Sequence, residues 1–370
     1  FLLLSVRLLS GLFILAPSET AYRQIIFLLS MIDFLLTAAI LVWPFGQLLS
    51  LTPFGSAFRL QLLDVLAVLL FVSLLPSYRK ITKDPLFKPL AVFSLTALLS
   101  LVVNAGSVSL TSLAYFLRFV SYTSFYFAFR VEGVKKYSRY LALAATLFLT
   151  IGLLQYFILP DVRFLAYLGF DDHYYRLIGS FLDPNFTGLV LAILVVLSPP
   201  PLLLIPLIAL VLTFSRASFL ALAIGLVYLS ITNRRFKLLL TLLLLGLFLY
   251  LVPKPFGEGV NLWRTFSIVS RFENQKNALL LFAQKPIFGQ GFNSRKVDNS
   301  FIFVLTTTGI FGFIAFVAFL KKVWQMTADP LAKASIMAIL VHSLFNNSFF
   351  YSWILAFFFL LVSLRSKKSA

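Results

Sequence analysis

The stretch "DNSFIFVLTTTGIFGFIAFVAFL", residues 298–320, carries one charged side chain, and that is its first residue, Asp298. The apolar remainder matches the roughly 20 residues that a helix needs to cross the hydrocarbon core of a membrane. Similar runs recur throughout the 370 residues, of which 60% are hydrophobic and 12% charged, with a mean hydropathy of +0.97. They are continuous rather than alternating, which favours helices over the strands of a membrane barrel. The sequence therefore predicts an all-α fold, a polytopic transmembrane helix bundle.

The apolar runs predict a single transmembrane domain over residues 1–370, with about 12–13 spans. The first run, 2–16, contains Arg7 and lacks a small-residue cleavage site, so we interpret it as a span and not as a signal peptide. Because the chain does not begin with Met, we expect its natural start to lie upstream. The predicted spans are 2–16, 25–43, 59–76, 86–103, 108–130, 138–159, 185–199, 200–214, 216–232, 236–252, 299–320, 331–346 and 348–364.

Lys and Arg in the short loops predict the orientation of the bundle. Five groups of these residues fall on one side of the span map, and short loops rich in Lys and Arg face the cytoplasm. The opposite face then holds a first outer loop, 160–184, and a second outer loop, 253–298, which are periplasmic if the protein is a bacterial inner-membrane protein. The groups are Arg79/Lys80/Lys83/Lys88, Arg130/Lys135/Lys136/Arg139, Arg234/Arg235/Lys237, Lys321/Lys322/Lys333 and Arg365/Lys367/Lys368.

The two outer loops are also cationic, so the net charge of +18 is only partly explained by the cytoplasmic loops. Positive charge on the outer face indicates either a bound anion or attraction to the headgroups of membrane lipids. Arg216 lies between two apolar runs in "LTFSRASFLAL", where an arginine needs a partner or a water-filled cavity. The loop cations are Arg163, Arg176, Lys254, Arg264, Arg271, Lys276, Lys285, Arg295 and Lys296.

The second outer loop contains the pattern of a short amphipathic helix at about 270–285. In "SRFENQKNALLLFAQKP", Ser270 and Glu273 have the spacing of a capping box, and Pro286 follows the last turn. We expect this helix to lie on the membrane surface or to roof a cavity, and an interfacial helix without chemistry is the alternative. The apolar residues that recur on one face are Phe272, Leu279 and Ala283.

The composition argues against metal and thiol chemistry. Cysteine is absent, and the two histidines, His173 and His342, are too few for a histidine-built metal site. The outer loops lack paired carboxylates at the spacing of a metal site. We therefore expect neither a metal nor another cofactor.

Four motifs occur in order: "YYRLIGSFLDPNFTG" (174–188), "LTFSRASFLALAIG" (212–225), "ALLLFAQKPIFGQGFNS" (278–294) and "DNSFIFVLTTTGIFG" (298–312). Together they resemble the O-antigen polymerase and ligase superfamily of bacterial envelope enzymes, over roughly residues 138–364. The resemblance implies transfer of a glycan from undecaprenyl pyrophosphate to an acceptor hydroxyl outside the cytoplasmic membrane. In this family polymerases use a second lipid-linked glycan as acceptor, ligases use lipid A–core, and some relatives use a protein hydroxyl. No nucleic acid partner is implied.

The resemblance also implies arginines that hold the pyrophosphate, and by motif these are Arg176 and Arg216, with Arg271 as a third candidate. Arginine suits the role because its fork matches phosphate oxygens and stays charged at neutral pH. Stabilising the charge of a leaving group is commonly the largest catalytic contribution. The further candidates for substrate binding are Asn299, Arg295, His342, Asn185 and Tyr175.

Asp298 is where the chain departs from the ligase pattern. Ligases of the superfamily carry His, then Asn, Ser or Gln, then nine residues and Gly-x-x-Gly; here Asn299, Gly309 and Gly312 keep that spacing, but Asp298 replaces the histidine. We therefore favour a polymerase of O-antigen or another surface polysaccharide over a ligase. Asp298 is a candidate catalytic base, which would require burial to raise its pKa, or it orients an arginine. The alternative is that Asp298 or Asn299 caps the helix that follows.

Several other polar residues have a structural interpretation. Asp183 precedes Pro184 at the start of a span and is expected to cap it. Asp171, Asp172 and His173 are expected in a solvated loop, with contact to sugar or acceptor as the alternative. For His342, a buried contact to Asn346 is favoured over catalysis. The aromatic residues that are candidates for sugar stacking or for the membrane interface are Tyr174, Tyr175 and Trp263.

Two other classes of protein compete with this prediction. A small-anion transporter would need discontinuous helices and charges at mid-depth, and here the charges within spans are few: Asp33, Asp64 and Arg118. No inverted repeat is visible. A peptidoglycan polymerase would use the same lipid carrier, but no residue points specifically to it.

Overall fold

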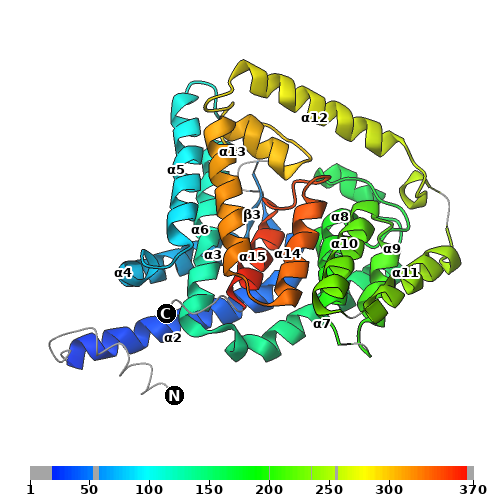
Figure 1. Cartoon of the computed structure of the whole chain (residues 1–370), viewed down its shortest axis with the longest axis horizontal. Coiled ribbons are helices and arrows are strands. Elements are labelled where there is room, and N and C mark those ends of the chain that lie inside the picture. Colours follow the sequence, from blue (N-terminus) through cyan, green and yellow to red (C-terminus); the bar gives the residue numbers. More distant parts are fainter. Residues whose placement is uncertain (1–18, 53–57, 200, 235, 255–256, 365–370) are drawn as a thin grey trace.

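The computed structural model describes residues 19–52, 58–199, 201–234, 236–254 and 257–364. Most of these residues are helical, and almost no sheet is present (Figure 1). Five helical stretches are long and apolar enough to cross a membrane, namely Leu29–Leu49, Leu62–Ile81, Val134–Ile158, Arg216–Asn233 and Ser300–Met326, and further apolar helices are shorter. The predicted all-α, multi-pass class is therefore confirmed.

The helices follow the predicted spans closely wherever the chain is described. The span predicted at 2–16 lies outside the described residues. The largest differences are at the start of α2, predicted at 25 and found at 19, and at the end of α13, predicted at 320 and found at 326. The helices are α2 (Glu19–Val42), α3 (Leu62–Leu74), α4 (Tyr78–Ile81), α5 (Phe87–Val103), α6 (Leu110–Glu132), α7 (Ser138–Ile158), α8 (Pro184–Leu197), α9 (Leu204–Leu212), α10 (Arg216–Asn233), α11 (Leu240–Leu251), α12 (Phe266–Gln284), α13 (Ser300–Met326), α14 (Pro330–His342) and α15 (Ser352–Ser363).

Short elements complete the described chain. An antiparallel pair of two-residue strands, β1 (Ser50–Leu51) and β3 (Leu60–Gln61), precedes α3. The 3-10 turns are η1 (Trp43–Leu49), η2 (Leu75–Ser77), η3 (Val134–Tyr137), η4 (Arg163–Leu168), η5 (Gly179–Phe181), η6 (Phe236–Leu239) and η7 (Glu258–Val260).

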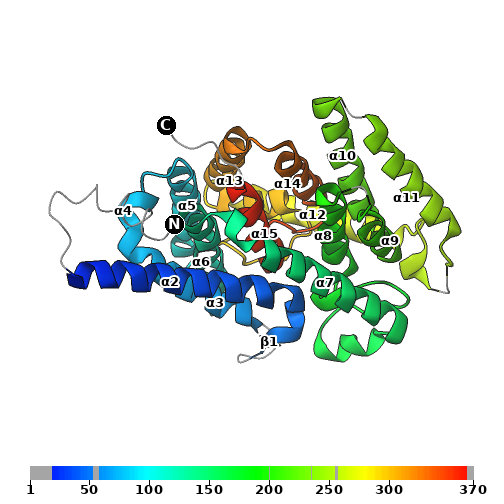
Figure 2. The same cartoon turned by 90° about the horizontal axis from the view of Figure 1, so that it is seen from below.

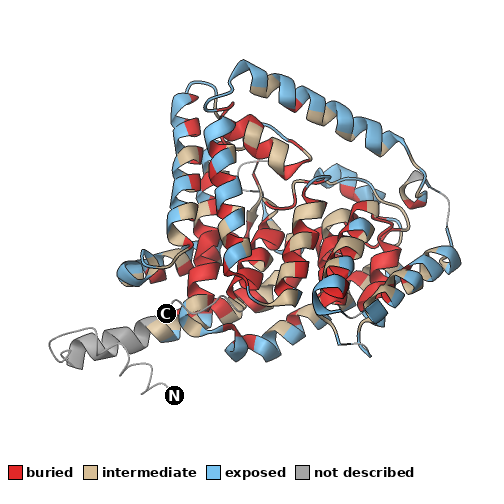
Figure 3. Ribbon diagram, in the orientation of Figure 1, coloured by how far each residue is buried: buried red, intermediate tan, exposed pale blue. Residues whose placement is uncertain are grey.

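Helix α15 forms the centre of the bundle. Apart from Phe357, every residue of this helix is buried, as expected for a helix that is apolar on all sides. Figure 3 shows buried residues concentrated in the middle of the molecule and exposed ones on its outer flanks. Helix α2 packs against α3 and α7 on the side seen in Figure 2. Many exposed side chains on the flanks are apolar, as in a protein surrounded by lipid.

One end of the bundle, which we call the loop face, joins the starts of α8, α10 and α13 to the ends of α9 and α14. Backbone hydrogen bonds connect Leu177 N to Leu212 O (2.9 Å) and Ser300 N to Ser343 O (2.9 Å). Residues far apart in the sequence therefore lie side by side there. The predicted alternation of spans requires these helix ends to share one face of the membrane.

Helix α13 is broken at Gly309, and a loop enters the break. Gly309 has φ 70° and ψ −169°, outside the helical region. The freed backbone groups pair with loop 286–291: Ile310 N donates to Pro286 O (2.8 Å), and Gln290 N donates to Thr306 O (2.9 Å). A Cβ atom on Gly309 would lie 2.2 Å from the carbonyl oxygen of Ile287. Only glycine fits the close approach of the two segments.

Helix α12 begins four residues before its predicted start, because 266 and not 270 is its first residue. The predicted capping box is wrong: Ser270 lies exposed within the helix, and the N-cap residue, Thr265, makes no side-chain cap bond. Tertiary contacts to the residues before the helix replace the cap. Figure 1 shows α12 along the edge of the molecule, from near α11 to near α5. Its Phe272 and Leu279 are exposed, while Ala278 is buried on the side that packs against α13.

A candidate anion site at the loop face

Arg176, in the loop before α8, is buried beside the end of α9. Its Nε donates to the carbonyl oxygen of Thr213 (2.9 Å), but its buried Nη2 has no hydrogen-bond partner among the described residues. Burial and the charge of Arg264 lower the pKa of Arg176 to about 9. At neutral pH the side chain is still charged, so the site holds a buried cation with a free donor. Such a group favours binding of an anion.

Arg216 is the first residue of α10, and its guanidinium holds the chain that leads into α12. Nη1 donates to the carbonyl oxygens of Leu262 (3.1 Å) and Arg264 (2.9 Å), and Nη2 donates to Ser267 Oγ (2.9 Å). These three contacts explain how α12 begins without a side-chain cap. Arg216 thus connects a helix of the bundle to the second outer loop.

Arg264 makes the reciprocal connection. Its Nη1 donates to the carbonyl oxygens of Gly259 (2.8 Å) and Asn261 (2.9 Å), and Nη2 donates to Phe214 O (3.3 Å), just before α10. Burial and the charge of Arg216 lower the pKa of Arg264 to about 10. The sequence indicates Arg264 only as one of the loop cations, because its partners are backbone groups that leave no sequence pattern.

Arg271 completes a group that we call the arginine cluster: Arg176, Arg216, Arg264 and Arg271. Its Nη2 donates to Asn346 Oδ1 (3.0 Å), and its charge contributes to the lowered pKa of both Arg176 and Arg264. Over the described ranges no salt bridge involves any of the four. The cluster therefore brings together the three predicted arginines and a fourth, with no carboxylate bound to them.

The carboxylates near the cluster have different roles. Asp183 caps α8 as predicted, since its Oδ1 accepts from the backbone N of Asn185 (2.6 Å) and Phe186 (3.3 Å). Burial raises the pKa of Asp183 despite the nearby charge of Arg176. Asn185 in turn accepts a hydrogen bond from Ser215 Oγ at its Oδ1 (3.1 Å).

The choice between Asp298 and Asn299 as helix cap is resolved in favour of Asn299. Asn299 Oδ1 accepts from the backbone N of Phe301 (2.8 Å) and Ile302 (3.1 Å), so the capping alternative for Asp298 is wrong. The backbone N of Asp298 donates to Asn274 Oδ1 (3.0 Å), while its half-buried carboxylate makes no hydrogen bond within the described chain. Burial raises the pKa of Asp298 and the charge of Arg271 opposes the rise.

His342 is fully buried, whereas His173 is half-buried. His342 contacts Asn346 as predicted, with His342 Nε2 3.4 Å from Asn346 Nδ2. His173 differs from its predicted place in a solvated loop, because its Nε2 is buried without a hydrogen-bond partner in the described chain. Burial and the charges of Arg176 and Arg264 lower the pKa of His173 to about 3, so it is neutral. The residues before it, Asp171 and Asp172, are exposed as expected.

The remaining candidates make no hydrogen bond through their side chains to the arginine cluster within the described residues. Tyr175 adopts φ 50° and packs edge to face with Tyr174, their ring centroids 4.6 Å apart. Arg295 is exposed, and no hydrogen bond or salt bridge links it to another described residue. Trp263 is 90% exposed on the loop before α12.

Each mid-depth charge that the sequence places within a span has a partner of opposite charge. Arg118 forms a buried salt bridge with Asp64 (2.6 Å), which also accepts from Tyr122 (2.9 Å). Asp33 pairs with Lys136 (2.8 Å). In the described ranges no group of three or more His, Cys, Asp or Glu is arranged to hold a metal ion.

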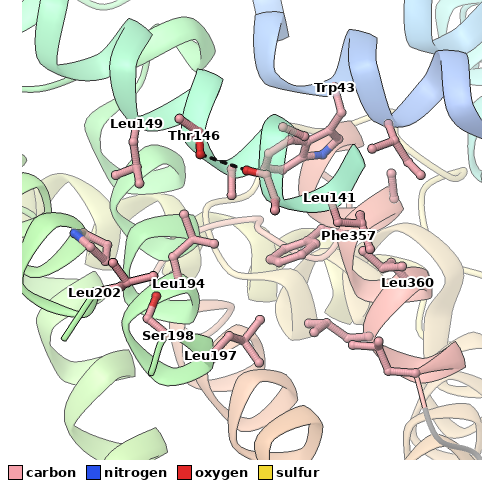
Figure 4. A pocket seen from close by; sticks show the side chains of 18 of the residues that line it. Trp43, Leu141, Thr146, Leu149, Leu194, Leu197, Ser198, Leu202, Phe357 and Leu360 are labelled. Atoms are coloured by element: carbon pink, nitrogen blue, oxygen red, sulfur yellow. Dashed lines mark hydrogen bonds between the residues drawn. The ribbon is translucent and has the colours of Figure 1, made fainter. Parts of the chain in front are cut away.

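A separate apolar cavity of about 720 Å³ lies between α2, α6, α7, α8, α9 and α15 (Figure 4). None of the four cluster arginines lines it. Trp43, Phe357 and Leu360 form part of its wall, and its few polar groups are hydroxyls such as that of Ser198. A cavity with this lining suits a hydrocarbon chain rather than a sugar or an anion.

The fold and the site together define a multi-pass helical membrane protein with a cationic cluster at one end of its bundle. Residues 201–317 match the family model described as O-antigen ligase. This match confirms the resemblance to the O-antigen polymerase and ligase superfamily. Arg216, Arg264, Arg271 and Asp298 lie within the matched region, whereas Arg176 lies before it. No curated protein matches the chain.

Proposed function

We propose that the protein is a membrane glycosyltransferase that moves a glycan from undecaprenyl pyrophosphate to an acceptor hydroxyl on the outer face of the bacterial inner membrane. Among members of the superfamily, a polymerase of O-antigen or another surface polysaccharide fits best, with a second lipid-linked glycan as acceptor. A ligase that uses lipid A–core is the alternative. The observation that carries the proposal is the buried Arg176: its Nη2 has no hydrogen-bond partner among the described residues, and no carboxylate of that part of the chain forms a salt bridge with the arginine cluster.

Pyrophosphate supplies negative charge to balance the positive charge of the arginine cluster. Arg176 offers the free donor. Arg216 instead donates its hydrogen bonds to carbonyl groups and so orders the segment that carries Arg264. When the anomeric C–O bond breaks, the electron pair leaves with the pyrophosphate. Fixed guanidinium groups in a site of low polarity stabilise that developing charge without reorganising.

Asp298 is the proposed catalytic base. The acceptor oxygen forms the new bond to the anomeric carbon, and its proton passes to the Asp298 carboxylate. Its free carboxylate, half-buried position and raised pKa support this role, because a base is most effective when its pKa lies closer to neutral pH. Arg271 is near enough to influence Asp298 electrostatically, so it is placed to hold the carboxylate in its charged form.

The apolar cavity supports a donor carried on a lipid. An isoprenoid chain needs a hydrocarbon environment, and each buried CH₂ group contributes about 0.8 kcal/mol. The cavity between α2, α7 and α15 offers such an environment within the bundle.

The deciding experiment supplies purified protein with a lipid-linked repeat unit, alone and with lipid A–core. A polymerase produces ladders of lipid-linked glycan without the core acceptor, whereas a ligase acts only when the core is present. Arg176→Ala should abolish either product, and Arg163→Ala is the matched control, because Arg163 is exposed in the same loop and pairs with Asp161. Full activity of Arg176→Ala would contradict the proposal.

The orientation has its own test, because the chain has no cysteine of its own. A single cysteine at exposed Asp172 should react with a membrane-impermeant thiol reagent in spheroplasts, whereas one at exposed Lys83 should react only after lysis. The reverse pattern would place the loop face in the cytoplasm.

A further inference from the structure

Asn274, on α12, contacts the segment 296–298 that leads into α13. Its Oδ1 accepts a hydrogen bond from the backbone N of Asp298 (3.0 Å), and its Nδ2 donates to the carbonyl oxygen of Lys296 (3.2 Å). A single side-chain amide therefore joins α12 to the backbone of the residue proposed as the catalytic base.

The partners of Asn274 allow its amide only one orientation. A backbone N–H can only donate and a backbone carbonyl oxygen can only accept, so the oxygen of Asn274 must face Asp298 and its nitrogen must face Lys296. An amide turned by 180° would lose both hydrogen bonds. The contact therefore specifies where the backbone of Asp298 lies relative to α12.

The residues next to Asp298 hold it from the other side. Asn299 caps α13 through its Oδ1, and its Nδ2 donates to the carbonyl oxygen of Leu344 (2.9 Å), just after α14. Val297 is buried. The backbone around Asp298 is thus fixed by both α12 and the turn after α14, while the carboxylate itself makes no hydrogen bond among the described residues.

Asn274 also relates Asp298 to the charges around it. Arg271 precedes Asn274 by three residues, which places the two side chains on neighbouring positions of one helix face. The positive charge of Arg271 favours the ionised carboxylate of Asp298, and the negative charge of Asp171, from the first outer loop, opposes it. The electrostatic environment of the carboxylate therefore depends on how residues 296–298 lie against α12.

We infer that Asn274 is a positioning residue: its side chain holds the backbone of Asp298 against α12, so that the free carboxylate keeps its place relative to Arg271 and the acceptor. The inference rests on the proposed function, in which Asp298 takes the proton of the acceptor hydroxyl. Asn274 acts through Asp298 and not on the substrate. Its contribution can be large, because a misplacement of about 1 Å can cost roughly 100-fold in rate.

The first experiment is a double-mutant cycle on transfer. Asn274→Ala removes both hydrogen bonds and should lower kcat about 10- to 100-fold with a much smaller change in the KM for the lipid-linked donor, because the base and not donor binding is disturbed. Asn277→Ala, at an exposed position of the same helix, should change neither. In the Asp298→Asn background, Asn274→Ala should have almost no further effect.

The second experiment uses the pH profile. Asn274→Asp keeps an acceptor for the backbone N of Asp298 and adds a negative charge near its carboxylate. A like charge disfavours the ionised form of Asp298, so the acid limb of the kcat profile should move to higher pH. Asn277→Asp adds the same charge at a position without a hydrogen bond to residues 296–298 and should move the limb less.

A merely structural asparagine would produce a different result. Its loss would lower kcat equally with and without the Asp298 carboxylate and leave the acid limb of Asn274→Asp in place, and either outcome would contradict the inference.

Hydrogen–deuterium exchange provides a readout that does not depend on transfer. The backbone amide of Asp298 should exchange faster in Asn274→Ala than in Asn277→Ala, and equal exchange would overturn the inference. If the unmodified protein transfers no glycan, the proposed function fails, while the exchange rates still decide whether Asn274 holds this backbone.

Discussion

Replacing Arg176 by Met should make the protein more stable and inactive at the same time. Folding lowers the pKa of Arg176 from the ordinary arginine value to about 9, and at about 1.4 kcal/mol per pH unit the charged form costs roughly 5 kcal/mol. Met keeps a long apolar stem beside Gly259, at which a Cβ would lie 3.1 Å from Arg176 Cδ. Loss of the hydrogen bond from Arg176 to Thr213 O costs roughly 1–2 kcal/mol and offsets part of the gain in stability. A net gain of about 3 kcal/mol remains.

The sign of the pH dependence follows from the same shift. The folded-state pKa of Arg176 lies below the unfolded one, so the destabilising effect is fully present below about pH 9. The destabilisation disappears as the pH rises from there towards the ordinary pKa of arginine. Measurements at neutral pH therefore contain the whole effect.

Thermal unfolding in detergent provides the assay. Arg176→Met should raise Tm by a few degrees, whereas Arg163→Met, at an exposed position of the same loop, should change it little. Inorganic pyrophosphate should raise the Tm of the unmodified protein and leave that of Arg176→Met unchanged. A less stable Arg176→Met variant that still responds to pyrophosphate would refute the reasoning.

Three further predictions concern the neighbouring elements. Asp298→Asn should lower the rate of transfer about 100-fold and remove the acid limb of the pH–activity profile, whose midpoint lies above the usual carboxyl pKa. Its Tm should stay constant because Asn299 is the helix cap, and normal kinetics of this variant would exclude Asp298 as the catalytic base. Arg216→Ala should cost roughly 2–4 kcal/mol of transition-state stabilisation with only partial rescue by Lys, and unchanged steady-state kinetics would end that assignment. Gly309→Ala should destabilise the protein by several kcal/mol in denaturation experiments. Gly246→Ala should not, because no atom lies within 4 Å of the added Cβ. Equal stability of the two variants would contradict the break in α13 at Gly309.

Hydropathy and local spacing alone determined the helical class and nearly every described span. These properties depend on residues within one turn or one membrane thickness of each other, so a window of sequence contains them. Asp183 illustrates the same point, because a cap bonds to amides two and three residues ahead. The helix of the second outer loop was also predicted, although four residues too late at its start.

Tertiary structure decided which of the many cations converge and which polar residues only support the fold. Arg216 bonds to groups around residue 264 and Asn299 to Leu344, contacts that cross long separations in the sequence. Ser270 has the local pattern of a cap, yet Arg216 organises the chain before α12 and moves the start of that helix. The break at Gly309 exists because loop 286–291 replaces the lost helical hydrogen bonds. Such choices depend on which distant groups satisfy buried donors and acceptors, and a linear sequence does not contain that pairing.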